Sequence, residues 1–141
     1  MRHIPADSIG IPAYNAFNSI ASAIVAAQAQ TLRNWELIIV DDGSTDETAE
    51  VAQRLAAADP RICLIQRSNQ GPSSARNIGA DLARGFIIAF LDADDLWAPD
   101  RLTGMLQTFR DRPNTGVLFS RTRFIDASSL KLGTLTPHHK S

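Results

Sequence analysis

The chain has 141 residues, 44% of them hydrophobic and 21% charged, with a formal net charge of -1. This length and composition exclude a disordered chain and predict a single globular domain over residues 1–141. The near-neutral charge excludes a general attraction to nucleic acid or to an anionic membrane, so any bound anion requires a local site.

The first part of the chain alternates strand-like and helix-like patterns. A short strand is predicted at 8–11, although Gly10 is a poor strand residue. The next segment, up to Ala29, has the apolar spacing of a helix. Residues 35–40 are nearly continuous in apolar character, which is typical of a parallel strand covered on both faces. The sequence Ser44 to Glu47 then predicts a capping box at the start of a second helix.

The middle and the end of the chain repeat the alternation. Strands are predicted at 62–66 and 86–91, with a helix at 73–83 between them. The strand at 86–91 is predicted to be buried, because it is a run of apolar residues. Pro99 is predicted to open a further helix as its first residue. A fifth strand is predicted at 117–120, with an extension over 121–125 and a return strand over 130–135.

The resulting order βαβαβαβαβ predicts an α/β fold. Alternating strands and helices give a mostly parallel, Rossmann-like sheet with helices on both faces, in three layers α/β/α. If the sheet order is 3-2-1-4, the carboxyl ends of the first, second and fourth strands are neighbours at a switch point, where such folds bind ligands. We assume this order.

These three strand ends are polar in ways that suit one ligand. Asp92 and Asp94 flank a single residue and are predicted to share a divalent cation. Phosphate oxygens of the ligand would complete the coordination shell of this cation. Arg76 adds a cation beside those phosphates. Tyr14 offers an aromatic face for a base, and Asp42 an acceptor for a base N–H or a ribose hydroxyl. Together they predict a site for a nucleoside diphosphate.

Four ordered blocks of the sequence resemble one family. They are 11–15, 35–46, 69–79 and 89–99, and they include Asn69-Gln70-Gly71, Ala75-Arg76-Asn77-Ile78-Gly79 and the Asp-x-Asp motif. In this order and spacing they are similar to family 2 glycosyltransferases with the GT-A fold. A lone Asp-x-Asp is a weak signal, whereas four ordered blocks are a strong one.

The resemblance implies a glycosyltransferase that moves a sugar from a UDP- or GDP-linked donor to an acceptor hydroxyl, mostly with inversion. The nucleotide-sugar site that it implies comprises Pro12, Tyr14, Asn15, Asp42, Arg76 and Asp92. Within it, Pro12 and Tyr14 line the base pocket, and Asp42 contacts the base. Asp94 and Asp92 are implied as ligands of Mn²⁺ or Mg²⁺, with Asp92 also near the ribose and Asp95 as a supporting residue.

The family also implies partners and a place of action. The acceptor is a saccharide or a lipid-linked molecule of cell-wall or polysaccharide biosynthesis, and no nucleic acid is expected. The sequence shows neither a signal peptide nor an apolar run long enough to cross a bilayer, so we predict a cytoplasmic protein, peripheral to the inner face of the membrane. The sugar, the base and the oligomeric state are left open.

The sequence departs from the family at its end. The general base of the family is an Asp or Glu in a later segment, and Asp126 comes too early to match it. The general base is therefore not assigned, and we predict the donor-binding half of a C-terminally incomplete catalytic domain. Two alternatives stay open, a non-catalytic nucleotide-binding module and a receiver-type phospho-acceptor domain. The receiver is disfavoured, because its acid pair follows the first strand, whereas Asp41 and Asp42 follow the second.

Overall fold

The computed structural model describes the backbone of residues 4–120, 122–125 and 131–136, and the side chains of residues 4–120. The chain divides into two compact units, residues 1–107 and 108–141. The single domain over 1–141 stays a prediction.

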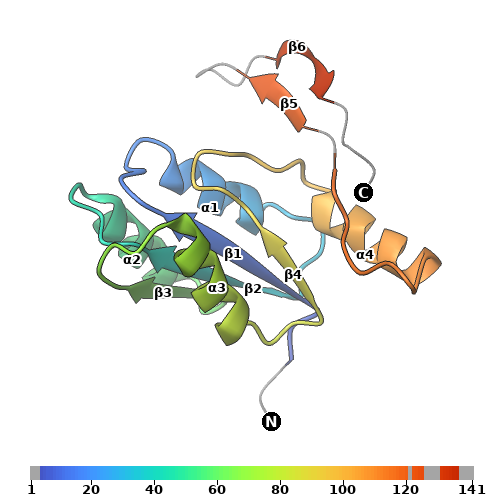
Figure 1. Ribbon diagram of the computed structural model, residues 1–141, viewed down its shortest axis with the longest axis horizontal. Coiled ribbons are helices and arrows are strands. Elements are labelled where there is room, and N and C mark those ends of the chain that lie inside the picture. The colour runs from blue at the N-terminus through green and yellow to red at the C-terminus, as the bar shows by residue number, and fades with distance from the viewer. Residues whose placement is uncertain (1–3, 121, 126–130, 137–141) are drawn as a thin grey trace. The chain divides into compact units, whose positions relative to one another are not determined.

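The first unit is built on a four-stranded sheet with the order β3-β2-β1-β4 (Figure 1). Its strands are β1 (Asp7–Ala13), β2 (Trp35–Asp41), β3 (Ile62–Gln66) and β4 (Ile87–Phe90). All three neighbouring pairs are parallel. The assumed order is thus confirmed, and the carboxyl ends of β2, β1 and β4 lie next to one another.

Helices cover both faces of this sheet. They are α1 (Ile20–Gln28), α2 (Thr48–Ala58), α3 (Pro72–Leu82) and α4 (Arg101–Asp111). On one face, Ile9 and Leu37 belong to a core that also contains buried residues of α1, α2 and the first turn of α4. On the other face, Ile38 and Val40 pack with Ala75 of α3. The predicted three-layer α/β/α arrangement is confirmed.

β1 extends further at both ends than the predicted strand 8–11. Gly10 does not interrupt it, because the missing side chain leaves room for a neighbour. A Cβ atom at Gly10 would lie 3.1 Å from the ring of Phe90 on β4. Gly10 therefore allows β1 and β4 to pack closely beside the site at the carboxyl edge.

The edge strand β4 differs from the buried strand that was predicted. Ala89 and Leu91, the residue after β4, are buried, whereas Phe86, Ile88 and Phe90 are exposed. The physical reason is that α3 packs on β1 and β2, so that it leaves this side of β4 uncovered among the described residues. Apolar composition alone could not distinguish a strand buried on both faces from one buried on a single face.

Two helix starts also differ from the prediction. α2 begins at Thr48 rather than after a Ser44 cap, because Ser44 donates to Asp41 and the backbone N–H of Thr48 donates to Asp46 instead (3.0 Å). α4 begins at Arg101 rather than at Pro99, whose carbonyl accepts the N–H of Thr31 at 2.8 Å.

A buried carboxylate fastens the amino-terminal edge of the sheet. Glu36 accepts hydrogen bonds from the Ser8 hydroxyl (2.6 Å) and from the backbone N–H and side chain of Arg84 (2.7 and 2.9 Å). Gly85, which follows Arg84, lies so close to β1 that an added Cβ would be 2.7 Å from the backbone of Asp7. These contacts fix the turn from α3 into β4.

The second unit contains a two-stranded antiparallel sheet, β5 (Thr122–Ile125) with β6 (Lys131–Thr136). The predicted return strand is confirmed. The predicted strand at 117–120 is wrong, since these residues pair with no strand in the described chain, and Val117 and Phe119 are 69% and 61% exposed.

Candidate functional site

Three carboxylates crowd together after β4 at the carboxyl edge of the sheet. One ligand oxygen from each of Asp92, Asp94 and Asp95 lies within 4.8 Å of the others. A turn sets this spacing, because the backbone N–H of Asp95 donates to the carbonyl of Asp92 at 3.0 Å. We call these three residues the acid cluster.

The acid cluster has the chemistry of a cation site. Burial raises the pKa of Asp95, and the nearby charges of Asp94 and Asp92 raise it further, against a smaller effect of Arg101. Such repulsion means that a cation placed among the oxygens would be stabilised. Carboxylate oxygens are also the donors that Mg²⁺ uses together with phosphate oxygens. The residues present therefore fit a divalent metal ion.

Arg76 lies beside the acid cluster, as the sequence predicted. It comes from α3, and its Nη2 forms an ion pair with Asp92 Oδ1 at 2.9 Å. Both side chains remain accessible, with 37% and 49% of their surface exposed. The pair therefore places one cation and one anion at the surface where a phosphate and a metal would meet.

Asp42 is buried, and its carboxylate accepts hydrogen bonds from the protein. Its oxygens accept the backbone N–H groups of Gln70 and Gly71, both at 2.9 Å, and the Nε of Arg67 at 3.1 Å. Burial raises the pKa of Asp42, but the bonds from Gln70, Arg67 and Gly71 outweigh burial and lower the pKa below its ordinary value. Asp42 is thus an ionised anchor for the loop before α3.

Arg67 is a residue of this site that sequence reasoning missed. It follows β3, and its side chain is only 11% exposed beside Asp42. Its Nη2 is buried with no hydrogen-bond partner among the described residues. An arginine directly after one strand, with an acid at the end of the neighbouring strand, was the signal available in the sequence.

Pro12 lies near the end of β1, and Tyr14 and Asn15 lie in the turn that follows this strand. Tyr14 is 51% exposed, so its ring is free to stack on a base. Asn15 has a positive φ of 47°, and its side-chain oxygen accepts the N–H of Thr45 at 2.8 Å. Asn15 therefore ties this turn to the loop after β2, a structural task in addition to the predicted contact with a ligand.

Pro12 and Arg76 line the same small recess, together with Gly10, Val40, Gly79 and Phe90. The structure thus brings Pro12 and Arg76 together at the β1–β4 boundary. Asp126, the late acid considered as a general base, lies outside the described residues. No general base is assigned to this chain.

A parallel α/β sheet with polar side chains gathered at its carboxyl edge is typical of doubly wound α/β proteins, which bind their ligands at that edge. The model of Glycosyl transferase family 2 matches residues 8–136. The chain belongs to this family, as the four sequence blocks predicted.

One relative is the chondroitin synthase of Escherichia coli, which is 38% identical over 126 residues. These residues are 89% of this chain and 18% of that protein. The chain therefore spans about a fifth of the length of this relative.

Two solved structures show the fold. A mannosyltransferase from Pyrobaculum calidifontis, in complex with GDP-Man and Mn²⁺, has a TM-score of 0.71 and 28% identity, over 78% of this chain and 34% of that one. Residues 1–349 of TarS from S. aureus, in complex with UDP, have a TM-score of 0.70 and 21% identity, over 87% and 42% of the two chains. Both are GT-A transferases, which confirms the predicted fold.

Among the described residues, none of the helices has the length and apolar character that a membrane crossing demands. The receiver-type alternative is not supported, because the acid pair follows β2 and the family match covers most of the chain.

Proposed function

We propose that this chain is the donor-binding part of a metal-dependent glycosyltransferase. It binds a UDP- or GDP-linked sugar at the carboxyl edge of the sheet. The sugar passes with inversion to a hydroxyl of a saccharide or lipid-linked acceptor. The setting is polysaccharide synthesis in the cytoplasm, at the inner face of the membrane.

The observation that carries the proposal is the acid cluster with Arg76 beside it. Three carboxylates within 4.8 Å and an ion pair of 2.9 Å form an electrostatic site that suits a metal-bridged diphosphate. A relative of the same fold was solved with GDP-Man and Mn²⁺, and another with UDP, which supports a nucleotide-sugar and a divalent metal ion here.

Each donor-site residue then has a task. Tyr14 stacks on the base beside Pro12, and Asn15 keeps the turn of Tyr14 in place. Asp42 holds the loop of Gln70 and Gly71 beside the base pocket.

The phosphates and the metal occupy the other half of the donor site. Asp94 and Asp92 hold the metal, Asp92 also approaches the ribose, and Asp95 supports the turn. Arg76 offers its guanidinium to the phosphates. When bound, Mn²⁺ or Mg²⁺ offsets the charge that develops on the departing nucleoside diphosphate. Transfer also needs a carboxylate that removes the acceptor proton, and none is assigned here.

The experiment compares nucleotide binding by the wild type, Asp94→Ala and a control, Asp81→Ala, which removes an exposed acid from α3. Thermal unfolding is measured with UDP or GDP, with and without Mn²⁺. A ligand at one hundred times its Kd stabilises the folded state by about 2.7 kcal/mol. We expect metal-dependent stabilisation in the wild type and in Asp81→Ala, and its loss in Asp94→Ala.

Undiminished metal-dependent binding by Asp94→Ala would contradict the assignment of the metal site. Absence of binding to any nucleotide in the wild type would contradict the proposed function. An assay of nucleotide-sugar turnover then separates an enzyme from a module that only binds.

A further inference from the structure

A second hollow lies at the opposite, amino-terminal edge of the sheet. It has a volume of about 370 Å³, and its lining includes Arg33, Trp35, Arg61 and Arg84. The seven residues of β1 separate this edge from the acid cluster by roughly 20 Å, at about 3.3 Å per residue. The hollow is therefore distinct from the proposed donor site.

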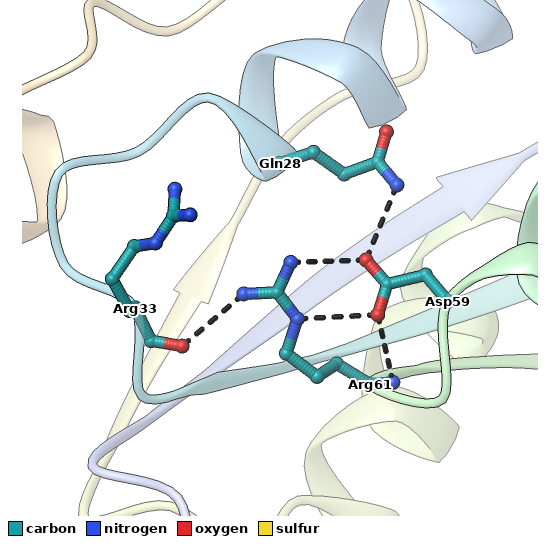
Figure 2. A network of polar contacts seen from close by, with 4 residues as sticks. All are labelled: Gln28, Arg33, Asp59 and Arg61. Atoms are coloured by element: carbon teal, nitrogen blue, oxygen red, sulfur yellow. Dashed lines mark hydrogen bonds and ion pairs between the residues drawn. The ribbon is translucent and has the colours of Figure 1, made fainter.

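One wall of this cavity is rigid. Arg61 binds Asp59 through two nitrogens, at 3.1 and 3.0 Å, and its third nitrogen donates to the carbonyl of Arg33 at 3.2 Å (Figure 2). Its guanidinium carbon also lies 3.7 Å from the centre of the Trp35 ring. Gln28 donates to Asp59 as well, at 3.2 Å. Arg61 and Trp35 are thus held in place before any ligand arrives.

The cavity has more positive than negative charge. Arg61 is balanced by Asp59, and Arg84 by Glu36 at 2.9 Å. No carboxylate within the described part of the chain forms an ion pair with Arg33, and Figure 2 shows its guanidinium without an interaction with the other residues drawn. Three guanidinium groups thus face two carboxylates.

The donors that remain are placed for an oxyanion. Arg84 uses Nε and Nη2 on Glu36, which leaves Nη1 for another acceptor, and its side chain is 53% exposed. Arg33 is exposed, and all the donors of its guanidinium remain for a ligand. Guanidinium groups match carboxylate and phosphate oxygens in charge and in geometry.

We propose that this cavity binds a small organic anion, whose carboxylate or phosphate group pairs with Arg33 and Arg84 while its carbon skeleton packs against Pro60 and the Arg61 guanidinium that covers the buried Trp35 ring. Ligand pockets commonly measure 300–1,000 Å³, so about 370 Å³ admits roughly one ring with its anionic group. Pro5 and Pro60 supply further apolar lining. We call this cavity the arginine cavity.

Trp35 gives the test a local reporter. The ring lines the arginine cavity, and its indole N–H is buried without an acceptor among the described residues. The indole N–H resonances of Trp35 and Trp97 are followed in ¹H–¹⁵N spectra of the whole chain, assigned with Trp97→Phe. Benzoate and phenyl phosphate are titrated as the two anion classes, and benzamide as the neutral counterpart of benzoate.

We expect a saturable shift of the Trp35 resonance with benzoate, phenyl phosphate or both, and the anion that binds more tightly identifies the chemical class. Arg33→Ala should weaken this binding at least tenfold. Arg54→Ala, which removes an exposed arginine from α2, should leave it unchanged within twofold. The carbonyl of Arg33 that Arg61 uses is retained in Arg33→Ala, and an unchanged urea midpoint checks that the fold is intact.

Three outcomes would overturn the proposal. They are the absence of a saturable Trp35 shift with either anion, equal binding of benzamide, and equal weakening by Arg33→Ala and Arg54→Ala. A shift of Trp97 alone would also overturn it, because the anion would then bind elsewhere. Nucleotide binding at the carboxyl edge does not enter this test, so the two proposals fail separately.

Discussion

Two carboxylates at the amino-terminal edge of the sheet, Glu36 and Asp59, are in the opposite electrostatic state to the acid cluster at the carboxyl edge. At the amino-terminal edge, Glu36 is 7% exposed and accepts hydrogen bonds from Ser8 and Arg84. Asp59 is bound there by Arg61, whose hydrogen bonds lower the pKa of Asp59 to about 2. At the carboxyl edge, the members of the acid cluster lie next to one another, and the pKa of Asp95 is raised.

This difference distinguishes carboxylates that stabilise the fold from carboxylates whose arrangement suits a bound cation. A buried carboxylate whose oxygens are filled by protein donors stabilises the loops that supply those donors. In the acid cluster, Arg76 is the ion-pair partner of Asp92 alone, and a cation placed among the three carboxylates would relieve their repulsion. Asp42 belongs to the first kind although it lies at the carboxyl edge, because backbone N–H groups fill its oxygens.

The largest expected loss of stability comes from Glu36→Gln. The substitution keeps the shape of the side chain but removes the charge that Arg84 and the buried Ser8 hydroxyl bind. Removing one partner of a buried ion pair commonly costs about 3–5 kcal/mol of stability. We expect the lower end, about 3 kcal/mol, because Arg84 is half exposed and water can solvate its unpaired charge. Urea unfolding at pH 7 measures this loss.

Glu50→Gln is the matched control, because it removes an exposed acid from α2. Its effect should stay within about 0.5 kcal/mol. Equal effects of the two substitutions would show that the network at the amino-terminal edge does not fasten the fold.

Asp7→Asn should change stability in the opposite direction. Asp7 is fully buried at the amino-terminal edge, and neither carboxylate oxygen has a partner among the described residues. Burial raises its pKa from 3.8 to about 6. The folded state therefore holds the proton more tightly, so wild-type stability falls as the pH rises from about 4 to 6 and stays reduced above 6.

The neutral amide avoids this penalty. A pKa difference of about two units corresponds to about 3 kcal/mol, so Asp7→Asn should be more stable than the wild type by about that amount at pH 8 and nearly equal at pH 4. Urea unfolding at both pH values checks this, with Asp81→Asn as an exposed control. A gain that is independent of pH would mean that folding does not raise the pKa of Asp7.

Much of the carboxyl edge could be predicted from the sequence. Alternating apolar runs and polar strand ends are local signals, and they located Asp92, Asp94 and Tyr14 at neighbouring strand ends. The parallel order of β1, β2 and β4 followed from the alternation together with one assumed sheet order. The acid cluster and Arg76 come together in the structure for this reason.

The rest depends on which chain segments meet, and no local pattern encodes this. Glu36 meets Arg84 across 48 residues, and Arg67 meets Asp42 across 25. The exposed face of β4 follows from where α3 packs, and composition does not specify it. The sequence therefore predicted the exposed acids after β4 better than the contacts that tie Glu36 and Asp42 to distant segments.

Asp94→Asn should have the smallest effect on stability, and its sign matters more than its size. Asp94 is exposed, and its charge raises the pKa of the neighbouring Asp95. Removing the charge without a metal relieves this repulsion, so stability at pH 7 should be unchanged or slightly higher, by no more than about 0.5 kcal/mol. Urea unfolding in the presence of a chelator measures it.

Adding Mn²⁺ should make the wild type more stable than Asp94→Asn. The wild type gains stability from a cation that binds only its folded state, whereas Asp94→Asn gains less because one ligand has lost its charge. Glu36→Gln should keep the full gain from Mn²⁺ despite its lower starting stability, since its network lies at the other edge. If Asp94→Asn instead destabilised the metal-free protein as much as Glu36→Gln does, the acid cluster would be part of the fold rather than a site for a ligand.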